Sequence, residues 1–384
     1  MGMGALYSYL AEHPVTYVTR QRERAEALPE DTPGYFVFAD PNKSTREILA
    51  SEKFRSHQER NPSDILVFKS NKQEEELIRN MGWKILNPNA ELAEKVEAKI
   101  SQTRWLGDLV RYLPPHAIRS CKDLRYDGKP SIVQFNHGHS GLGTTLLDRE
   151  AKAVELATKF PARLVRITKF IKGAVYTNNN VVVNDRVLVG NLSYQITGLI
   201  PLTSNSFATV GNDFGLGARL GEKERNTICD ITRAVGEKLT QSGWQGCFGT
   251  DFIIEDETKV VYLIEVNARQ TASVVFESKL QKLSNPRGLT TFEAHLKALV
   301  NLPVEGELVK VSEGSRFLQR LTDRVLPLNV AKKLNEFGFE TIVFNPETDG
   351  DDLLHICSAG NLMQAPGQPS ELGRQVLETL IKHD

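Results

Sequence analysis

The sequence lacks the features of secreted and membrane proteins. Only four of its 384 residues are cysteines, and they are widely scattered, with no CxxC pair. We interpret them as reduced, structural thiols. No apolar run is long enough for a transmembrane helix, and residues 1–30 contain no basic segment followed by a long apolar one. We therefore expect neither a membrane span nor a signal peptide, and a cytoplasmic location.

The sequence also lacks an excess of charge of either sign. Lysine and arginine number 47 against 48 aspartates and glutamates, which gives a formal net charge of −1. This balance argues against a general basic surface for nucleic acid, although a local cluster such as RITKFIK (166–172) could bind a small anion. No internal repeat or low-complexity segment is found. The length and the 40% of hydrophobic residues suffice for two or three packed domains.

Strands alternate with helices near the N-terminus. Helices are predicted for residues 44–60, with Ser44 as the N-cap, and for 72–82. The β-rich runs are GYFVFAD (34–40), DILVFKS (64–70) and WKILNPN (83–89). This alternation predicts a small parallel α/β domain, which we assign to residues 1–90.

The rest of the sequence predicts a larger mixed part. One helix is expected over 91–113, ended by two prolines, and another over 222–241. Expected strands include 131–135, 162–171, 174–183 and 186–198. We place a central domain at 91–302 and a C-terminal extension at 303–384. Two roles stay open for the extension: it forms part of a substrate site, or it forms the contact surface of a homodimer.

A hairpin at 247–270, CFGTDFIIEDETKVVYLIEVNARQ, is the most informative feature. Glu265 and Asn267 are two apart on a strand and point to the same face, and pairing across the turn brings Asp251 beside them. Such oxygen ligands suit Mg²⁺. Without a cation, two carboxylates about 4 Å apart repel by about 4 kcal/mol at an effective dielectric constant of about 20. The alternative is a solvated polar face of the hairpin.

A glycine-rich loop lies within VQFNHGHSGLGTTLL (133–147). Such a loop can wrap its backbone N–H groups around a phosphate, but glycine clusters mostly form turns. His137 and His139 have no third metal ligand nearby, so we interpret them as polar loop residues. No lysine or arginine lies between Lys129 and Arg149, so the loop itself brings no cation. Neither a Walker lysine nor a nucleophile elbow is present.

Together these segments resemble the ATP-grasp superfamily of carboxylate–amine ligases over about residues 20–300. The run 133–144 is similar to the flexible loop that closes over the ATP phosphates. The run ITKFIKG (167–173) resembles the hinge whose backbone bonds adenine, here at Lys169 and Ile171. The hairpin resembles the terminal metal motif, a carboxylate followed by E-x-N-x-R, and this motif is the most specific of the three.

The resemblance implies an α/β fold with an α+β ATP-grasp core. Its parts are the small parallel N-terminal domain, a central lid at about 115–172, and a C-terminal subdomain with an antiparallel sheet and an extra C-terminal segment. It implies ATP and Mg²⁺, or Mn²⁺, as cofactors. The implied partners are small-molecule carboxylate and amine substrates, with no nucleic acid and no membrane.

The resemblance also implies a reaction and roles for individual residues. A carboxylate would take the γ-phosphoryl group of ATP, and an amine would then displace phosphate from the acylphosphate to form an amide. The implied metal ligands are Asp251, Glu265 and Asn267, and the implied catalytic residues are Arg269 and Lys99. The implied nucleotide contacts are Lys99, Gln134, His139, Ser140, Gly141, Gly143, Thr168, Lys169, Phe170 and Ile171.

Three departures from the family pattern concern the nucleotide. Gln134 stands where the family has a second lysine, Thr168 replaces the acid of the hinge, and Ala174 and Val175 stand where an acid often holds the ribose. We expect Lys99, the loop N–H groups and Mg²⁺ to supply the missing charge, and a lysine at 134 to tighten ATP binding. Two alternatives stay open: a kinase-like phosphotransferase and a catalytically degraded nucleotide-binding regulatory protein. The segment 198–217 is either part of the acceptor pocket or a surface loop.

Overall fold

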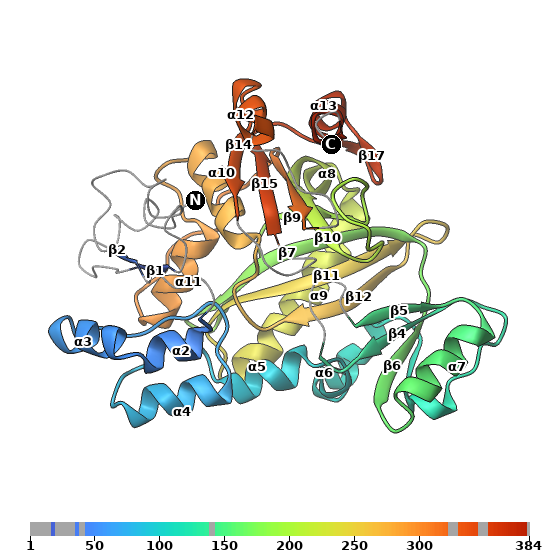
Figure 1. Cartoon of the computed structure of the whole chain (residues 1–384), viewed down its shortest axis with the longest axis horizontal. Coiled ribbons are helices and arrows are strands. Elements are labelled where there is room, and N and C mark those ends of the chain that lie inside the picture. The colour runs from blue at the N-terminus through green and yellow to red at the C-terminus, as the bar shows by residue number, and fades with distance from the viewer. Residues whose placement is uncertain are drawn as a thin grey trace.

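The protein consists of a large antiparallel sheet, a smaller antiparallel sheet and a helical N-terminal part (Figure 1). The structure, a computed structural model, describes residues 43–137, 143–321, 329–344 and 352–381, together with the backbone of two short strands at 17–19 and 35–37. Its helices and strands agree with the expected mixed α/β class, and its large sheet with the expected antiparallel subdomain.

The elements are as follows. The helices are α2 (Thr45–Ala50), α3 (Glu52–Arg60), α4 (Lys72–Asn80), α5 (Ala90–Glu97), α6 (Lys99–Leu106), α7 (Glu150–Lys159), α8 (Phe214–Ala218), α9 (Glu222–Gln241), α10 (Val274–Ser284), α11 (Thr291–Leu299), α12 (Asn329–Glu336) and α13 (Glu371–Ile381). The strands are β1 (Tyr17–Thr19), β2 (Tyr35–Val37), β3 (His116–Ser120), β4 (Ser131–Phe135), β5 (Thr144–Leu147), β6 (Leu164–Lys169), β7 (Gly173–Val183), β8 (Arg186–Leu188), β9 (Leu192–Thr197), β10 (Thr209–Asp213), β11 (Gly246–Glu255), β12 (Val261–Asn267), β13 (Ser315–Arg320), β14 (Glu340–Val343), β15 (Asp352–Ser358), β16 (Met363–Ala365) and β17 (Gln368–Pro369).

The N-terminal part is parallel, as predicted, but its strands are shorter than predicted. β1 and β2 pair in parallel, and Ser44 caps α2 in a capping box. The strands expected at 64–70 and 83–89 are reduced to one parallel bridge, between Ile65 and Ile85. The side chain of Asn87 replaces the next backbone pair, because it accepts from Val67 N at 2.8 Å and donates to Val67 O at 2.6 Å.

The helix expected over 91–113 is broken at Ala98, which has φ −68° and ψ 126°. The side chain of Ala98 cannot cap the helix that follows, so the cap comes from Asn136, just after β4. Lys99 N donates to Asn136 O at 3.1 Å, and Ile100 N donates to Asn136 Oδ1 at 3.0 Å. The break therefore ties the first residue of α6, Lys99, to the beginning of the glycine-rich loop.

The smaller sheet is antiparallel, with the strand order β3-β6-β4-β5. It packs with α7 around a small core that includes Cys121, Val133, Leu147 and Val165. These elements lie within the segment that we expected to form the lid. In Figure 1 they lie at one end of the molecule, beside the edge of the large sheet.

The larger sheet has nine described strands in the order β12-β11-β7-β9-β10-β13-β15-β14, with β8 paired to β7, and every described pairing is antiparallel. Phe248, Phe252 and Leu263 of β11 and β12 share a core with Ile231 and Val235 of α9. The C-terminal strands join this sheet through the pairing of β10 with β13. The sequence after residue 303 therefore extends the central sheet. The domain boundaries themselves stay predictions.

Residues 170–172 connect the two sheets, since β6 belongs to the smaller one and β7 to the larger one. Gly173 begins β7 where the backbone approaches β11 very closely: a Cβ atom there would lie 1.9 Å from Ile254 O. A side chain at 173 would separate β7 from β11, so the position requires glycine.

All four cysteines are free, in agreement with the expected reduced thiols. In the part of the chain that the structure describes, no helix combines the length and the apolarity needed to cross a membrane.

His295 of α11 should make the stability of the fold depend on pH. Its Nδ1 accepts a hydrogen bond from Cys247 N at 2.9 Å, and burial lowers its pKa to about 4. The unfolded chain, with an ordinary histidine pKa of about 6.5, takes up a proton first as the pH falls. The free energy of unfolding is therefore highest above about pH 6.5 and declines towards pH 4, with a loss of about 2 kcal/mol at pH 5.

Urea unfolding at about pH 7.5 and pH 5 measures this loss. His295→Asn is the matched variant, because its Oδ1 can accept from Cys247 N but it does not titrate. The variant should lose about 2 kcal/mol less than the parent between the two pH values. Equal losses in the two proteins would show that His295 does not contribute to the pH dependence.

Candidate active site

The hairpin of β11 and β12 brings the three predicted metal ligands together. Asp251 lies directly opposite Glu265, and Gly249 lies opposite Asn267. Asn267 Nδ2 donates to Asp251 Oδ2 at 3.1 Å. Their convergence on one face agrees with the prediction from the spacing, while their role as metal ligands stays a prediction.

Lys99 lies against this group of carboxylates. Only 4% of the residue is exposed, and its Nζ lies 2.5 Å from Glu265 Oε1. Lys99 is thus not the solvated helical lysine that is usual for an isolated lysine. Burial by itself would raise the pKa of Glu265, but the charges of Lys99, Arg269 and Arg166 outweigh it and lower that pKa.

Asp251 has the opposite shift. Burial, together with the negative charge of Glu265, raises the pKa of Asp251 to about 6. One of these two neighbouring carboxylates thus resists ionisation. A divalent cation bound between them would stabilise the ionised form of both.

Arg269 extends the network towards the N-terminal part. Its Nη1 donates to Asn267 Oδ1 at 3.0 Å, and its Nε lies 3.5 Å from Glu97 Oε1. Glu97 is the last residue of α5 and is 7% exposed, and it also pairs with Lys69 Nζ at 2.5 Å. Sequence reasoning missed Glu97. Its position two residues before Lys99 was the available signal, but only the break at Ala98 turns both side chains inwards.

Arg166 is the second residue to which sequence reasoning gave no individual role, although it begins the basic run 166–172 that could bind a small anion. It lies on β6 directly opposite Gln134 of β4, and only 2% of it is exposed. Its Nε and Nη2 donate to Gln134 Oε1 at 3.1 and 2.8 Å, its Nη1 donates to Gln102 Oε1 at 3.3 Å, and its Nη2 donates to Ile264 O at 3.1 Å. A cation therefore lies directly behind Gln134, next to the strand that carries Glu265.

The hinge residues comprise the end of β6, with Thr168 and Lys169, and the connection between the two sheets at 170–172. Thr168 and Ile171 are buried, and Phe170 N donates to Pro130 O at 3.2 Å. Lys169 N donates to Pro115 O at 2.9 Å, and Lys169 Nζ pairs with Glu255 at 3.0 Å. Because the backbone N–H of Lys169 already donates a hydrogen bond to Pro115 O, a backbone contact of Lys169 with adenine would have to use its C=O group. The adenine contacts stay predictions.

The glycine-rich loop is described only at its ends. His139, Ser140 and Gly141 lie outside the described residues, so their predicted contacts with phosphate have no structural account. Gly143 has φ 82°, which favours glycine, and its carbonyl oxygen accepts from Phe135 N at 3.0 Å.

The donor set fits Mg²⁺. Within the described ranges no group of three or more His, Cys, Asp and Glu side chains is placed to hold a metal. Mg²⁺ does not need such a group, because it commonly uses one or two carboxylates together with waters and substrate phosphates. Asp251 and Glu265 supply the carboxylates. For Asn267 Oδ1 to become a third ligand, its carboxamide must turn away from Arg269.

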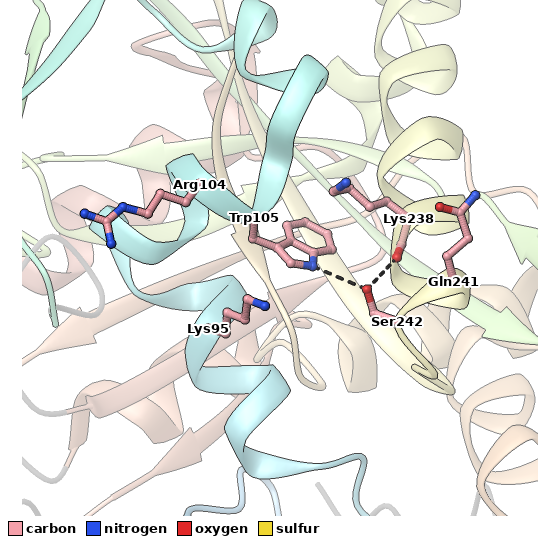
Figure 2. A pocket seen from close by; sticks show the side chains of 6 residues that line it. All are labelled: Lys95, Arg104, Trp105, Lys238, Gln241 and Ser242. Atoms are coloured by element: carbon pink, nitrogen blue, oxygen red, sulfur yellow. Dashed lines mark hydrogen bonds between the residues drawn. The ribbon is translucent and has the colours of Figure 1, made fainter.

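One cavity lies away from these residues. This cavity has a volume of about 380 Å³. It is lined by residues of α5, α6 and α9 and by the C-cap of α9: Lys95, Arg104, Trp105, Lys238, Gln241 and Ser242 (Figure 2). Trp105 Nε1 donates to Ser242 Oγ at 3.4 Å. None of the predicted site residues lines this cavity, so we place the chemistry by the network of charged groups. A smaller hollow, of about 20 Å³, reaches Arg269 and Lys69.

The sequence of this region matches a known family. Residues 96–273 match the family described as an ATP-grasp domain, and this range contains every predicted site residue from Lys99 to Arg269. This part of the chain is therefore an ATP-grasp domain. Its sequence matches no curated protein sequence.

Solved structures with a similar fold cover nearly the whole chain. Carboxyaminoimidazole ribonucleotide synthase from Aspergillus clavatus, complexed with ATP, has 12% identity and a TM-score of 0.66, over 100% of this chain and 96% of that one. N5-carboxyaminoimidazole synthetase from Staphylococcus aureus has 12% identity and a TM-score of 0.65, over 99% and 94%. L-amino acid ligase from Bacillus licheniformis has 15% identity and a TM-score of 0.63, over 94% and 89%. At these identities the likeness shows the fold, which agrees with the predicted ATP-grasp fold.

Proposed function

We propose that the protein is an ATP-dependent ligase that joins a small-molecule carboxylate to an amine through an acylphosphate and releases ADP and phosphate. The observation that carries the proposal is the network formed by two sets of contacts that meet where Asp251 lies opposite Glu265: Lys99 with Glu265, and Asn267 with Asp251 and Arg269. The network lies within the match to the ATP-grasp domain. The names of the similar structures, an L-amino acid ligase, a synthase and a synthetase, support ligation. We keep the cytoplasm as the expected location.

The proposed reaction needs little covalent chemistry from the protein. A carboxylate oxygen of the substrate attacks the γ-phosphorus, and the bond to the bridging oxygen breaks to release ADP. The amine nitrogen then attacks the acyl carbon, and phosphate leaves with the electrons of the C–O bond while the amine loses a proton. Mg²⁺, held by Asp251 and Glu265, would neutralise charge on the β- and γ-phosphates.

The chain's own residues divide the work between them. Lys99 lies at the foot of the glycine-rich loop and can turn from Glu265 towards a phosphate when a metal takes over that carboxylate. Arg269 keeps a positive charge beside Asn267, where it would steady the acylphosphate and the tetrahedral intermediate that follows. Glu97 holds Arg269 from the other side.

Hydroxylamine trapping tests the proposal. The protein is incubated with Mg²⁺, ATP and pooled amino acids, and ADP release identifies the carboxylate that it accepts. With hydroxylamine in place of the amine, an acylphosphate gives a hydroxamate in step with ADP. ADP that appears with a phosphorylated product, and without hydroxamate or amide, would instead establish the kinase-like alternative. Nucleotide binding without ADP release from any pool would establish the regulatory alternative.

A further inference from the structure

Arg166 is a buried cation, and among the residues that the structure describes no carboxylate lies at hydrogen-bonding distance from it. Its described partners are all neutral oxygens, those of Gln134, Gln102 and Ile264. Burial lowers its pKa to about 10, and the charge of Glu265 opposes this shift, so the guanidinium stays protonated at neutral pH. A buried charge that is held only by neutral acceptors lowers the stability of the fold. This cost suggests that the charge of Arg166 has a function.

Gln134 is the cross-strand neighbour of Arg166 and its main hydrogen-bond partner. Two hydrogen bonds from Arg166 occupy Gln134 Oε1, so the orientation of the carboxamide is fixed. In the described part of the chain no acceptor bonds to Gln134 Nε2, and the residue is partly exposed. The NH₂ group is therefore a hydrogen-bond donor with a fixed direction, and it is accessible to a ligand. Gln134 lies near the end of β4, just before the glycine-rich loop.

The position of the pair ties it to the proposed nucleotide site. Asn136, two residues after Gln134, bonds the N-terminus of α6 next to Lys99. On its other side Arg166 bonds Ile264 O, next to Glu265. The pair thus lies beside both the lysine and the carboxylates that would bind the phosphates and the metal.

We propose that Gln134 and Arg166 act as one phosphate-binding unit, in which Arg166 supplies the positive charge and orients the carboxamide, and Gln134 donates its NH₂ group to a phosphate oxygen of the nucleotide. Arg166 is thus a positioning residue and Gln134 makes the contact. The inference rests on the proposed nucleotide site and deepens it. It also reverses the expectation that a lysine at 134 tightens ATP binding, because that ammonium would face the guanidinium of Arg166.

The test measures the binding of MgADP and MgATP by calorimetry, with thermal unfolding of each variant. Gln134→Glu keeps an acceptor for Arg166 and should fold as well as the parent, yet it lacks the NH₂ donor and adds a negative charge. Its affinity should fall at least about tenfold. Gln134→Lys and Arg166→Gln should each weaken binding to a similar degree. The double variant, Gln134→Lys with Arg166→Gln, again has one cation and one amide in the pair, so it should bind within about threefold of the parent.

Arg119→Gln is the matched control, since Arg119 is exposed on β3 of the same sheet. It should bind like the parent. Parent-like affinity in Gln134→Glu, or a double variant as weak as Arg166→Gln alone, would overturn the unit while leaving the ligase proposal intact. A parent that binds neither nucleotide would overturn both. A parent that binds nucleotide but forms no hydroxamate would remove only the ligase.

Discussion

Replacing Glu265 by glutamine should lower the rate of ADP formation at least about 10³-fold at saturating ATP, because it removes a charged ligand from the proposed Mg²⁺ site and nearly keeps its shape. The structure adds a second effect, since Lys99 loses the carboxylate that lies 2.5 Å from its Nζ. Unpairing a buried ion is destabilising, but 25% of the Glu265 side chain is exposed, so we expect about 1–3 kcal/mol. Steady-state kinetics over a Mg²⁺ series, with a thermal melt, separates the two effects.

The matched control for this prediction is Glu257→Gln. Glu257 lies in the exposed turn of the same hairpin, so the same chemical change is made outside the network. Its rate should stay within about twofold of the parent rate. If Glu265→Gln folds, turns over like the parent and keeps its dependence on Mg²⁺, the metal site does not lie on this hairpin.

The parts of the site that the sequence predicts are those set by local pairing. A short polar turn between two apolar runs sets the register of β11 and β12 as far as the pair of Phe252 and Leu263. An irregularity between Asp251 and Phe252 then shifts the register by one residue and places Asp251 opposite Glu265. The two-residue period of a strand then fixes the face on which Asn267 lies. The hairpin and the shared face of Glu265 and Asn267 need only neighbouring residues, so they can be predicted without the fold, whereas the shift that aligns Asp251 with Glu265 cannot.

The parts that the sequence does not predict depend on distant contacts. The pairing of Arg166 with Gln134 requires β4 and β6 to be neighbours, although β5 and α7 separate them in the chain. The break at Ala98 requires Asn136 as an external cap, which helix propensity cannot reveal. The pairing of β13 with β10, which joins the C-terminal strands to the central sheet, likewise brings together distant residues such as Asn212 and Arg316.

Replacing Arg269 by lysine should have the second largest effect. Arginine reaches two partners in different directions, Asn267 Oδ1 through Nη1 and Glu97 Oε1 through Nε. A lysine ammonium is a single point charge and cannot keep both contacts, so the charge moves from the place where the acylphosphate would form. We expect kcat for amide formation to fall about 10²- to 10³-fold, while KM for ATP changes less than about threefold.

The split between kcat and KM decides the role of Arg269, since a purely structural role would lower stability without selecting one kinetic constant. Arg287→Lys, in an exposed loop, makes the same change away from the network and should retain parent-like kinetics. The rate of hydroxamate formation is measured alongside, because it reports the first half-reaction alone. A loss of amide formation larger than the loss of hydroxamate places Arg269 in the attack of the amine, and equal losses place it in the formation of the acylphosphate. A kcat within about threefold of the parent, or an effect confined to KM for ATP, would remove Arg269 from the chemistry.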